Sequence, residues 1–363
     1  MNFMPCTTKA EQNQVLRFIK AHYKDDPNYI DYSTPILKEI FYRKTPFAQR
    51  LTQETYLIEE GGQCVGVTTF LIHDNYSEVV QIAFFEYAEN LEIAKQVVEM
   101  AKGFGYRTGA TEIVVGMNGH VNYGLGLTLE QGHRPTFGAM YTKPYYSEHF
   151  QQLGFEETRL ISFEYPWENR EFPLNDKWRE RFHKRFTFRA MTRATYDQDL
   201  IYYTHLNNQC FGDHQFYFPR TAAEDQSLFK DLKFFMEEGS LIFAEKEGTP
   251  IGFLLWYPDW GELMVRGETL SPLTYLKKRL HKKRVKTFKL VEWAVLPEYR
   301  QKGIPVGLLA ACFEYVKDKS FTKCKTSWIL EDNLNSSGFG FKWAKPYESH
   351  GVYTLRLNRG PHE

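Results

Sequence analysis

Two pairs of glycines in this chain lie in similar surroundings, and both pairs have the same separation. Gly66 and Gly252 each lie in a segment made of an apolar run, a polar turn and a second apolar run. Gly154 and Gly340 each precede a phenylalanine and a strand-like run. Both pairs are 186 positions apart. A constant spacing between recurring features is typical of a duplicated fold, so we expect two copies of one fold.

The order of expected elements is the same in each copy. Helical patterns come first, followed by a pair of strands, a central strand, a helix and further strands. Strands that alternate with helices indicate a mixed α/β (α+β) arrangement. Residues 167–178 contain a proline and charges without a hydrophobic period, which predicts a linker. We therefore expect two domains, residues 1–166 and 179–363, on either side of it.

The composition excludes several classes of protein. Lys and Arg number 45, as do Asp and Glu, among 363 residues, so no overall field favours nucleic acid or an anionic membrane. No apolar run reaches the length of about 18 residues that a spanning helix needs. The five cysteines are scattered and never form a C-x-x-C pair, which favours reduced thiols. The first residues lack a signal-peptide pattern. These features predict a cytoplasmic protein.

One segment carries a pattern suited to an anionic ligand. Residues 291–312 read VEWAVLPEYRQKGIPVGLLAAC, which predicts a strand, a short loop and a helix. The N–H groups and the partial positive charge at a helix N-terminus suit a pyrophosphate. Gly303 lets the backbone approach a ligand closely, and Arg300 and Lys302 add positive charge.

This segment resembles the GNAT superfamily of acyl-CoA N-acyltransferases. The residues that match its pattern are Val295, Pro297, Arg300, Gly303 and Ile304. In the first half, YTKPYYSEHFQQLGF (141–155) is similar to a signature of uncharacterised two-domain bacterial GNAT proteins. The resemblance implies two tandem GNAT-like domains, each a mixed, mostly antiparallel sheet flanked by helices.

The resemblance also implies a reaction and its cosubstrate. GNAT enzymes transfer an acyl group from CoA to an amine without a metal, so we expect acetyl-CoA or another acyl-CoA and no metal. A backbone N–H near Val295 would steady the thioester oxygen. The residues expected to contact the cofactor are Val295, Arg300, Gln301, Lys302, Gly303, Ile304, Gly307 and Asn333.

Two residues are candidates for the proton transfers. Glu292 lies on the strand that leads into the loop, where many family members carry a carboxylate, and it would deprotonate the amine directly or through a water. Alternatively, Glu292 is a surface or ion-paired glutamate with a structural role only. The family tyrosine that protonates the thiolate has no counterpart in residues 333–343. Tyr353 is the substitute that we predict, with Tyr347 as the alternative.

Pro305 stands where the family pattern ends in glycine or alanine. Proline has no N–H, but it is tolerated at the start of a helix. Because the residue before a proline is disfavoured in helical conformation, we expect the helix to begin at Pro305. The loop would then lose at most one phosphate donor. The corresponding part of the first half contains Glu86, Glu89 and Glu92 without glycine or arginine. The first half is therefore predicted to be a degenerate copy that shapes the substrate groove.

The resulting hypothesis is an acyl-CoA-dependent N-acyltransferase that acetylates a primary amine of a small or amino-acid-like molecule. Two alternatives stay open: a non-catalytic CoA- or small-molecule-binding protein, and an aminoacyl- or long-chain acyltransferase on a doubled GNAT fold. The basic run at 275–286 is interpreted as a solvated face, although it could meet the 3′-phosphate of CoA, nucleic acid or an acidic substrate. We expect no nucleic-acid or membrane partner, and the oligomeric state stays open.

Overall fold

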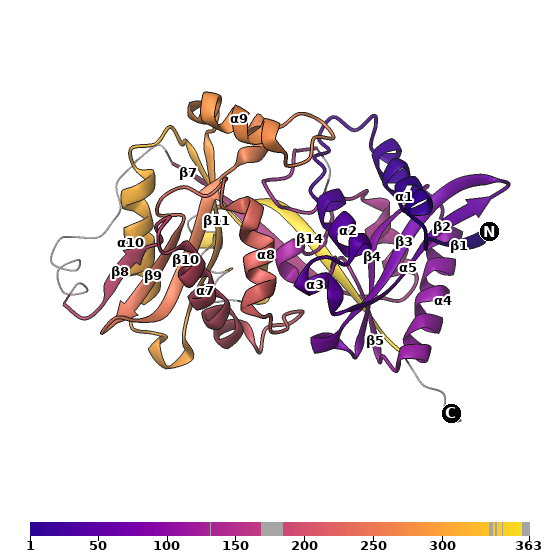
Figure 1. The fold of residues 1–363 in the computed structure, drawn as a ribbon, viewed down its shortest axis with the longest axis horizontal. Helices are drawn as coiled ribbons and strands as arrows, with labels where there is room; N and C mark the ends of the chain where they lie inside the picture. The colour runs from indigo at the N-terminus through magenta and orange to yellow at the C-terminus, as the bar shows by residue number, and fades with distance from the viewer. Residues whose placement is uncertain (131, 168–183, 334–336, 338–339, 343, 358–363) are drawn as a thin grey trace.

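The structure is a computed structural model that describes residues 1–357 except residues 131, 168–183, 334–336, 338–339 and 343. From residue 168 onward the predicted linker 167–178 lies outside the described residues. Figure 1 shows two lobes side by side, one for each half of the chain, with long strands crossing between them.

Each lobe follows the predicted order of elements. In the first half these are β1 (Asn2–Pro5), α1 (Lys9–His22), α2 (Ser33–Tyr42), α3 (Pro46–Gln49), β2 (Leu51–Glu60), β3 (Gln63–His73), β4 (Val79–Tyr87), α4 (Leu91–Thr108), β5 (Glu112–Val115), β6 (Leu127–Thr128), α5 (Tyr145–Gln152) and β7 (Glu156–Pro166). In the second half they are β8 (Thr187–Ala190), α7 (Tyr196–Phe211), α8 (Ala222–Leu232), β9 (Leu241–Lys246), β10 (Thr249–Pro258), α9 (Pro272–His281), β11 (Thr287–Val295), α10 (Ile304–Val316), β12 (Lys323–Thr326), β13 (Ile329–Leu330) and β14 (Lys345–Arg356). Short 3-10 turns include η3 (Trp260–Leu263), η4 (Lys282–Arg284) and η5 (Pro297–Tyr299).

All the strands belong to one continuous sheet. Its 14 strands include a main path in the order β1-β2-β3-β4-β5-β14-β7-β12-β11-β10-β9-β8, with β6 paired to β14 and β13 paired to β7. The pairs β4–β5 and β11–β12 are parallel, and the neighbouring pairs β3–β4 and β10–β11 are antiparallel. The predicted fold class, mixed and mostly antiparallel strands flanked by helices in each half, is confirmed, and the two expected sheets are joined into one.

The two halves exchange their last strands. β14, at the C-terminal end, pairs with β5 of the first half, and β7 of the first half pairs with β12 of the second half. β7 and β14 also pair with each other over nine residue pairs. The sheet is therefore continuous across the junction, and residues 345–356 complete the sheet of the first half.

The glycines that revealed the repeat occupy equivalent places in the two copies. Gly66 on β3 pairs with Tyr87 at the end of β4, and Gly252 on β10 pairs with Val295 at the end of β11. A Cβ atom on Gly66 would lie 2.9 Å from Tyr87 Cβ, and one on Gly252 would lie 2.8 Å from Ala294 O. Both positions therefore need glycine because the next strand passes too close for a side chain.

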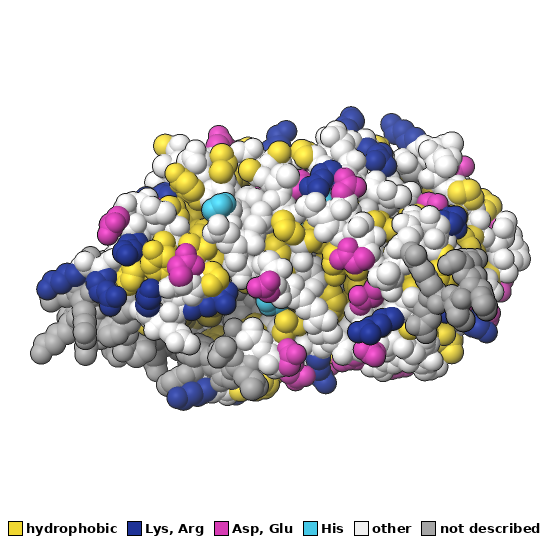
Figure 2. Space-filling view, turned by 90° about the horizontal axis from the view of Figure 1, so that it is seen from below, with side chains coloured by type: hydrophobic (Ala, Val, Ile, Leu, Met, Phe, Trp, Pro, Cys, Tyr) yellow, Lys and Arg dark blue, Asp and Glu magenta, His cyan; other side chains and the backbone are white. Residues whose placement is uncertain are grey.

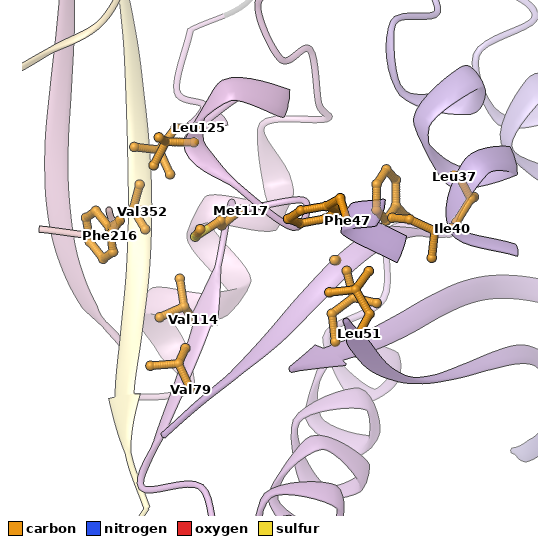
Figure 3. Packing of buried hydrophobic residues seen from close by; sticks show 14 of the residues in the cluster. Leu37, Ile40, Phe47, Leu51, Val79, Val114, Met117, Leu125, Phe216 and Val352 are labelled. Atoms are coloured by element: carbon orange, nitrogen blue, oxygen red, sulfur yellow. The ribbon is translucent and has the colours of Figure 1, made fainter. Parts of the chain in front are cut away.

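The core of the first half contains side chains from the second half. Leu37, Phe47 and Val114 of the first half share one buried cluster with Phe216, which follows α7, and with Val352 of β14 (Figure 3). Because the two halves share this core and one sheet, the surfaces between them hold a fixed geometry.

The copies differ most in the connection that precedes the central strand. In the first half, 5 residues (74–78) join β3 to β4, whereas 28 residues (259–286), including α9, join β10 to β11.

Among the described residues no helix combines the length and the apolar character that crossing a bilayer requires.

Candidate active site

The central strands of the second half diverge at one end. β11 pairs with β12 in parallel only from Thr287 to Leu290, and the last link is the bond from Ser327 N to Leu290 O. Beyond this point β13 pairs with β7 instead. Residues 291–295 of β11 therefore keep β10 as a neighbour on one edge and leave the other edge open.

Backbone donors point into this opening. Leu296 N donates to Ile251 O on β10, and hydrogen-bonded residues alternate along an antiparallel pair. The N–H groups of Val295 and Trp293 consequently point away from β10, toward the open edge. Unpaired N–H groups on a strand edge are the kind of donor that can stabilise a developing oxyanion.

The loop after β11 presents further donors at the start of α10. Gln301 and Gly303 adopt left-handed φ angles of 61° and 76°, and Gly303 is the N-cap residue without a side-chain cap. Val306 N and Gly307 N turn back to Gly303 O. The first N–H groups of α10 are therefore not covered by a capping side chain, as an anion site requires.

The basic side chains of the loop are exposed and held by the protein's own carbonyls. Arg300 Nη2 donates to Cys210 O at 3.3 Å, and Lys302 Nζ donates to Glu298 O at 2.8 Å. The face seen in Figure 2 shows Lys and Arg side chains beside hydrophobic ones in the half of the molecule formed by the second lobe.

Three expectations for this loop need correction. Helix α10 begins at Ile304, one residue earlier than predicted, so Pro305 is its second residue. Gly307 faces the protein interior, because a Cβ atom there would overlap the Phe188 ring; its glycine is needed for helix-to-strand packing. The Ile304 side chain is fully buried in the core, so only the backbone of this residue could meet a cofactor.

A cavity of about 260 Å³ opens at the divergence of the strands. Its floor is formed by β11, the segment 326–330, and β14, and its other walls come from α7, α8 and the first-half segments 121–125 and 136–140. The volume lies slightly below the roughly 300–1,000 Å³ that is typical of ligand pockets. The cavity is therefore built by both halves, and Asn333 is one of the predicted residues that line it.

Glu292 lies in this cavity as part of a hydrogen-bonded network. Tyr203 of α7 donates its hydroxyl to Glu292 Oε2 at 2.6 Å. Burial raises the pKa of Glu292, while the bond from Tyr203 and the charge of Arg220 act in the opposite direction. A carboxylate whose pKa is raised is a stronger base than an ordinary glutamate, which suits general base catalysis.

The groups around this pair are themselves fixed. Arg220 forms a buried ion pair with Asp225 of α8 at 2.5 Å, and Thr204 donates to the other oxygen of Asp225 at 2.7 Å. With its amide oriented to satisfy both groups, Asn122 of the first half accepts from Arg220 Nη1 and Nη2 at 2.5 and 3.0 Å. The position of Tyr203 and Glu292 thus depends on contacts from both halves.

The far end of the cavity is polar. A bulge between Leu255 and Trp256 of β10 and their partners on β11 puts Lys289 on the same face of the sheet as Glu292. Lys289 donates to Phe137 O at 3.2 Å, and burial lowers its pKa to about 8. Glu348 and His350 of β14 are buried here and line the cavity.

His350 has one buried nitrogen without a hydrogen-bond partner in the described part of the chain. Its Nε2 lies 3.4 Å from Met140 O and 3.7 Å from Glu348 Oε1, so both neighbours of this nitrogen are acceptors and the proton belongs there. Burial lowers the pKa of His350, which favours the neutral ring. Nδ1 is then an acceptor, and it has no hydrogen-bond partner in the described part of the chain.

The structure does not bring Tyr353 to this site. The residue is fully buried in the core of the first half, where its hydroxyl donates to Glu157 Oε2 at 2.9 Å, and it is not among the residues that line the cavity. The structure therefore does not support the assignment of Tyr353 as proton donor to the thiolate, because its hydroxyl is directed toward Glu157.

The equivalent opening in the first half is filled by side chains. Tyr87, which is the counterpart of Val295, donates its N–H to the hydroxyl of Tyr146, and Phe84 N donates to Asn118 Oδ1. The N-terminus of α4 is capped by Asn90, which accepts from Glu92 N. Both kinds of donor that stay uncovered in the second half are thus occupied in the first.

Sequence reasoning missed most of the residues that surround Glu292. Tyr203 and Asn207 are four residues apart on a helix that the sequence predicts, so their shared face was a usable signal. Arg220, Glu348 and His350 come from distant segments with no shared pattern.

In the described part of the chain, no group of three or more His, Cys, Asp or Glu residues could hold a metal.

Comparison with known proteins gives one family match and two relatives that align over almost the whole chain. Residues 202–339 match the acetyltransferase (GNAT) family. The chain is 22% identical over 368 residues to protein YghO of Escherichia coli (strain K12), covering 96% of this chain and 94% of that protein. It is 21% identical over 376 residues to the bacterial ceramide synthase of Caulobacter vibrioides (strain NA1000 / CB15N), covering 96% and 97%.

Solved structures share the fold at low sequence identity. A tandem GNAT protein from the clavulanic acid biosynthesis pathway matches with a TM-score of 0.56 and 11% identity, and the match covers 99% of each chain. A glucosamine N-acetyltransferase region of a fungal enzyme matches with a TM-score of 0.59 and 13% identity, over 98% of this chain and 38% of that one. Residues 202–339 thus match the acetyltransferase (GNAT) family, and the chain as a whole has the fold of a tandem GNAT protein.

Proposed function

We propose that this protein is an acyl-CoA-dependent N-acyltransferase with a single reaction centre, in the second half. The observation that carries the proposal is the position of Glu292: a carboxylate with a raised pKa lies in the cavity at the strand opening, bonded to Tyr203. The uncovered N-terminus of α10 suits the pyrophosphate of CoA, with the side chains of Arg300, Gln301 and Lys302 at its rim.

The proposed reaction needs two proton transfers. The amine nitrogen attacks the thioester carbonyl carbon and gives its proton to Glu292, directly or through a water. The N–H groups of Val295 and Trp293 stabilise the oxyanion. The C–S bond then breaks, the thiolate takes up a proton from water, and the products are an amide and free CoA.

The cavity supports a substrate with a hydrocarbon chain over acetyl transfer to a small amino acid. Its α7 and α8 walls contribute Phe211, Leu228, Phe229 and Leu232. One relative that matches over almost its whole length is named a bacterial ceramide synthase, and a ceramide is the amide of a fatty acid with a long-chain amino alcohol. We therefore prefer the long-chain alternative to acetyl-CoA as donor.

The polar end of the cavity supports an acceptor that carries a hydroxyl as well as an amine. Glu348 and the Nδ1 atom of His350 are hydrogen-bond acceptors, so they suit a group that donates. A hydroxyl can donate to His350 while the amine lies near Glu292. Glu348 and His350 would then position the acceptor, and Glu292 would be the catalytic residue.

The test compares donors and acceptors with purified protein. Release of CoA thiol is followed with acetyl-, octanoyl- and palmitoyl-CoA, using a long-chain amino alcohol and its short-chain analogue, and the amide is identified by mass spectrometry. We expect kcat/KM to rise with chain length in both partners. Faster turnover with acetyl-CoA than with palmitoyl-CoA would restore the acetyltransferase interpretation.

A pair of glutamate variants separates an enzyme from a binding protein. Glu292→Gln should lower kcat by about 10²-fold or more, in the range usual for loss of a general base, while CoA still raises the melting temperature. Glu298→Gln is the matched control, because Glu298 is exposed on the turn after β11. CoA binding without turnover of any of these pairs would support the non-catalytic alternative.

A further inference from the structure

Helix α9 exposes a stripe of leucines. Leu273, Leu276 and Leu280 are 56%, 51% and 67% exposed, and their spacing puts them on one face of the helix. Val265, in the same insertion, is 61% exposed. Exposed apolar side chains gathered in this way mark an interaction surface.

The opposite face of α9 is anchored to the protein. Thr274 is buried, and Ser271 caps the helix by accepting from Thr274 N. Lys278 donates to Phe234 O at 2.8 Å and lies over the Trp260 ring, 4.7 Å from its centroid. The orientation of the helix is thereby fixed, so the leucines point outward in the folded protein and do not cover the core.

Basic residues surround the leucine stripe. Residues 272–286 contain seven Lys and Arg and no Asp or Glu. Lys277 and Lys278 pair with Glu268 and Glu237 of neighbouring segments. Five further members of the run are exposed: Arg279, Lys282, Lys283, Arg284 and Lys286. An apolar stripe between basic side chains is the pattern of a helix that lies in a membrane interface.

The other copy of the fold shows that the sheet does not need this element. The matching connection in the first half has 5 residues with one 3-10 turn and no α-helix, compared with 28 residues in the second half. Figure 1 shows α9 at the edge of the second lobe, on the side opposite the face of Figure 2. The insertion therefore adds a basic, leucine-bearing helix at the periphery of a fold that closes without it.

From these observations we infer that α9 docks this protein on an anionic lipid surface. The leucines enter the headgroup region, and Arg279 and η4 contact the lipid phosphates. The charge selects this occupant: a second copy of the chain would bring the same seven basic residues against these, whereas an anionic bilayer is complementary. This association is peripheral, and it departs from the sequence-based expectation that no membrane is a partner.

The experiment is flotation of the full-length protein with lipid vesicles. Vesicles of phosphatidylcholine with 40% phosphatidylglycerol are compared with vesicles of pure phosphatidylcholine, at low and at physiological salt. We expect binding to the anionic vesicles only, weakened by salt because the attraction is screened. Failure to bind anionic vesicles at low salt would overturn the inference.

Two triple variants test the two parts of the surface. L273Q/L276Q/L280Q and K282E/K283E/R284E should each weaken partitioning at least tenfold, since one basic residue near an anionic surface contributes about a factor of five. K9E/R17E/K20E on α1 is the matched control, because it makes the same charge change at exposed residues outside α9 and should partition like the wild type. The substituted side chains are exposed in all three variants, so we expect the melting temperatures to equal that of the wild type. Equal melting temperatures would show that a loss of vesicle binding is not caused by unfolding.

Two other results would contradict the inference that α9 docks on lipid. Equal loss of binding in the α1 control would mean that overall charge, and not α9, attracts the protein, which contradicts the inference. A dimer in solution that L273Q/L276Q/L280Q abolishes would assign the leucines to a second copy of the chain, which also contradicts it. Vesicle binding does not require turnover, so the outcome is independent of the proposed reaction.

Discussion

At the scale of single residues, the hydrogen bond between Tyr203 and Glu292 influences the pH at which Glu292 loses its proton and can act as a base. The hydroxyl of Tyr203 donates to Glu292 and opposes the rise in pKa that burial causes. Tyr203→Phe should therefore raise the pKa of Glu292 further. The base must be deprotonated to act, so the acidic limb of the kcat/KM profile should move to higher pH by about one to two units, as expected for a charged hydrogen bond of about 1.5–3 kcal/mol.

Tyr217→Phe provides the comparison for this profile. Tyr217 also lines the cavity, but its hydroxyl donates to Asn208 at 2.6 Å. Its removal should leave the acidic limb in place. If both variants moved the limb equally, the shift would reflect general rearrangement of the cavity, and Tyr203 would have no special relation to the base.

Glu86 is a second buried carboxylate, and its role is structural. It accepts from Tyr146 at 2.7 Å and Tyr23 at 2.9 Å, and burial raises its pKa to about 8. His22 lies 3.7 Å away, and burial together with the charge of Lys143 lowers its pKa to about 4. At neutral pH both groups are therefore uncharged in the folded protein.

This arrangement gives stability a definite dependence on pH. Above pH 6.5 the unfolded chain has lost the proton of Glu86, whereas the folded protein keeps it up to about pH 8. Stability contributed by this group consequently falls as pH rises, by about 1.5 kcal/mol between pH 6.5 and 8. His22 has the opposite sign but acts mainly below pH 6.5. Thermal melts of wild type and Glu86→Gln from pH 6 to 9 should therefore converge or cross in favour of the variant, and a constant difference would contradict the assignment.

Single residues also show how far sequence reasoning reaches. Glu292 could be predicted because it precedes a recognisable loop on the same strand. Tyr353 could not be evaluated in the same way, because its place depends on which sheet β14 joins, and that pairing is made with β5 and β7, roughly 200 positions away in the chain. His350 and Glu348 were inaccessible for the same reason.

At the scale of elements, the start of α10 raises the question of what Pro305 does. Val306 N and Gly307 N already turn back to Gly303 O, and Pro305 offers no N–H. Pro305→Gly adds one donor where a pyrophosphate is proposed to bind. A charged hydrogen bond contributes about 1.5–3 kcal/mol, and partial compensation by water lowers the expected gain to about 1 kcal/mol, or about fivefold tighter CoA binding.

The same substitution should also destabilise the protein without ligand. Glycine gives the unfolded chain more freedom than proline, which costs about 1 kcal/mol. Calorimetry with CoA and melting without it measure the two effects separately. Unchanged or weaker CoA binding would mean that the proline shapes the helix start, or that the pyrophosphate lies elsewhere.

The elements differ in how well sequence predicts them. α10 was predicted to within one residue at its start, because proline and glycine have strong positional preferences. In α9 the basic run was interpreted as a solvated face. Its leucines at positions 273, 276 and 280 were visible in the sequence, but their outward orientation depends on the contacts of Lys278 with Phe234 and Trp260, which no local pattern encodes.

At the scale of the whole molecule, duplication was predictable and strand exchange was not. The glycine pairs showed two copies, and in one of these pairs Gly66 and Gly252 are each required by the close approach of the next strand. The choice of partner for the last strand has no local signature, because β7 and β14 have equivalent positions in the two copies. Only the pairing of β7 with β12 and of β14 with β5 distinguishes an exchanged structure from two separate sheets.

Strand exchange predicts that the two halves unfold together. Val352 belongs to the second half in sequence, but its side chain is fully buried in the core of the first half. All seven tryptophans lie at position 167 or beyond. Trp328 packs against the first-half core, so tryptophan fluorescence follows mainly the second half. A fluorophore on Cys64, which is exposed on β3, follows the first. We expect the two signals to share one denaturation midpoint, as a cooperative transition requires.

Val352→Ala turns this expectation into a decisive measurement. Removing two buried methyl groups should destabilise the first-half core by about 1–3 kcal/mol. If the exchanged strands couple the halves, the midpoints reported by tryptophan and by the Cys64 label move by the same amount of denaturant. If the halves fold independently, the Cys64 signal moves alone and the tryptophan signal stays in place. Coupling would mean that the cavity, whose walls come from both halves, forms and is lost together with the whole fold.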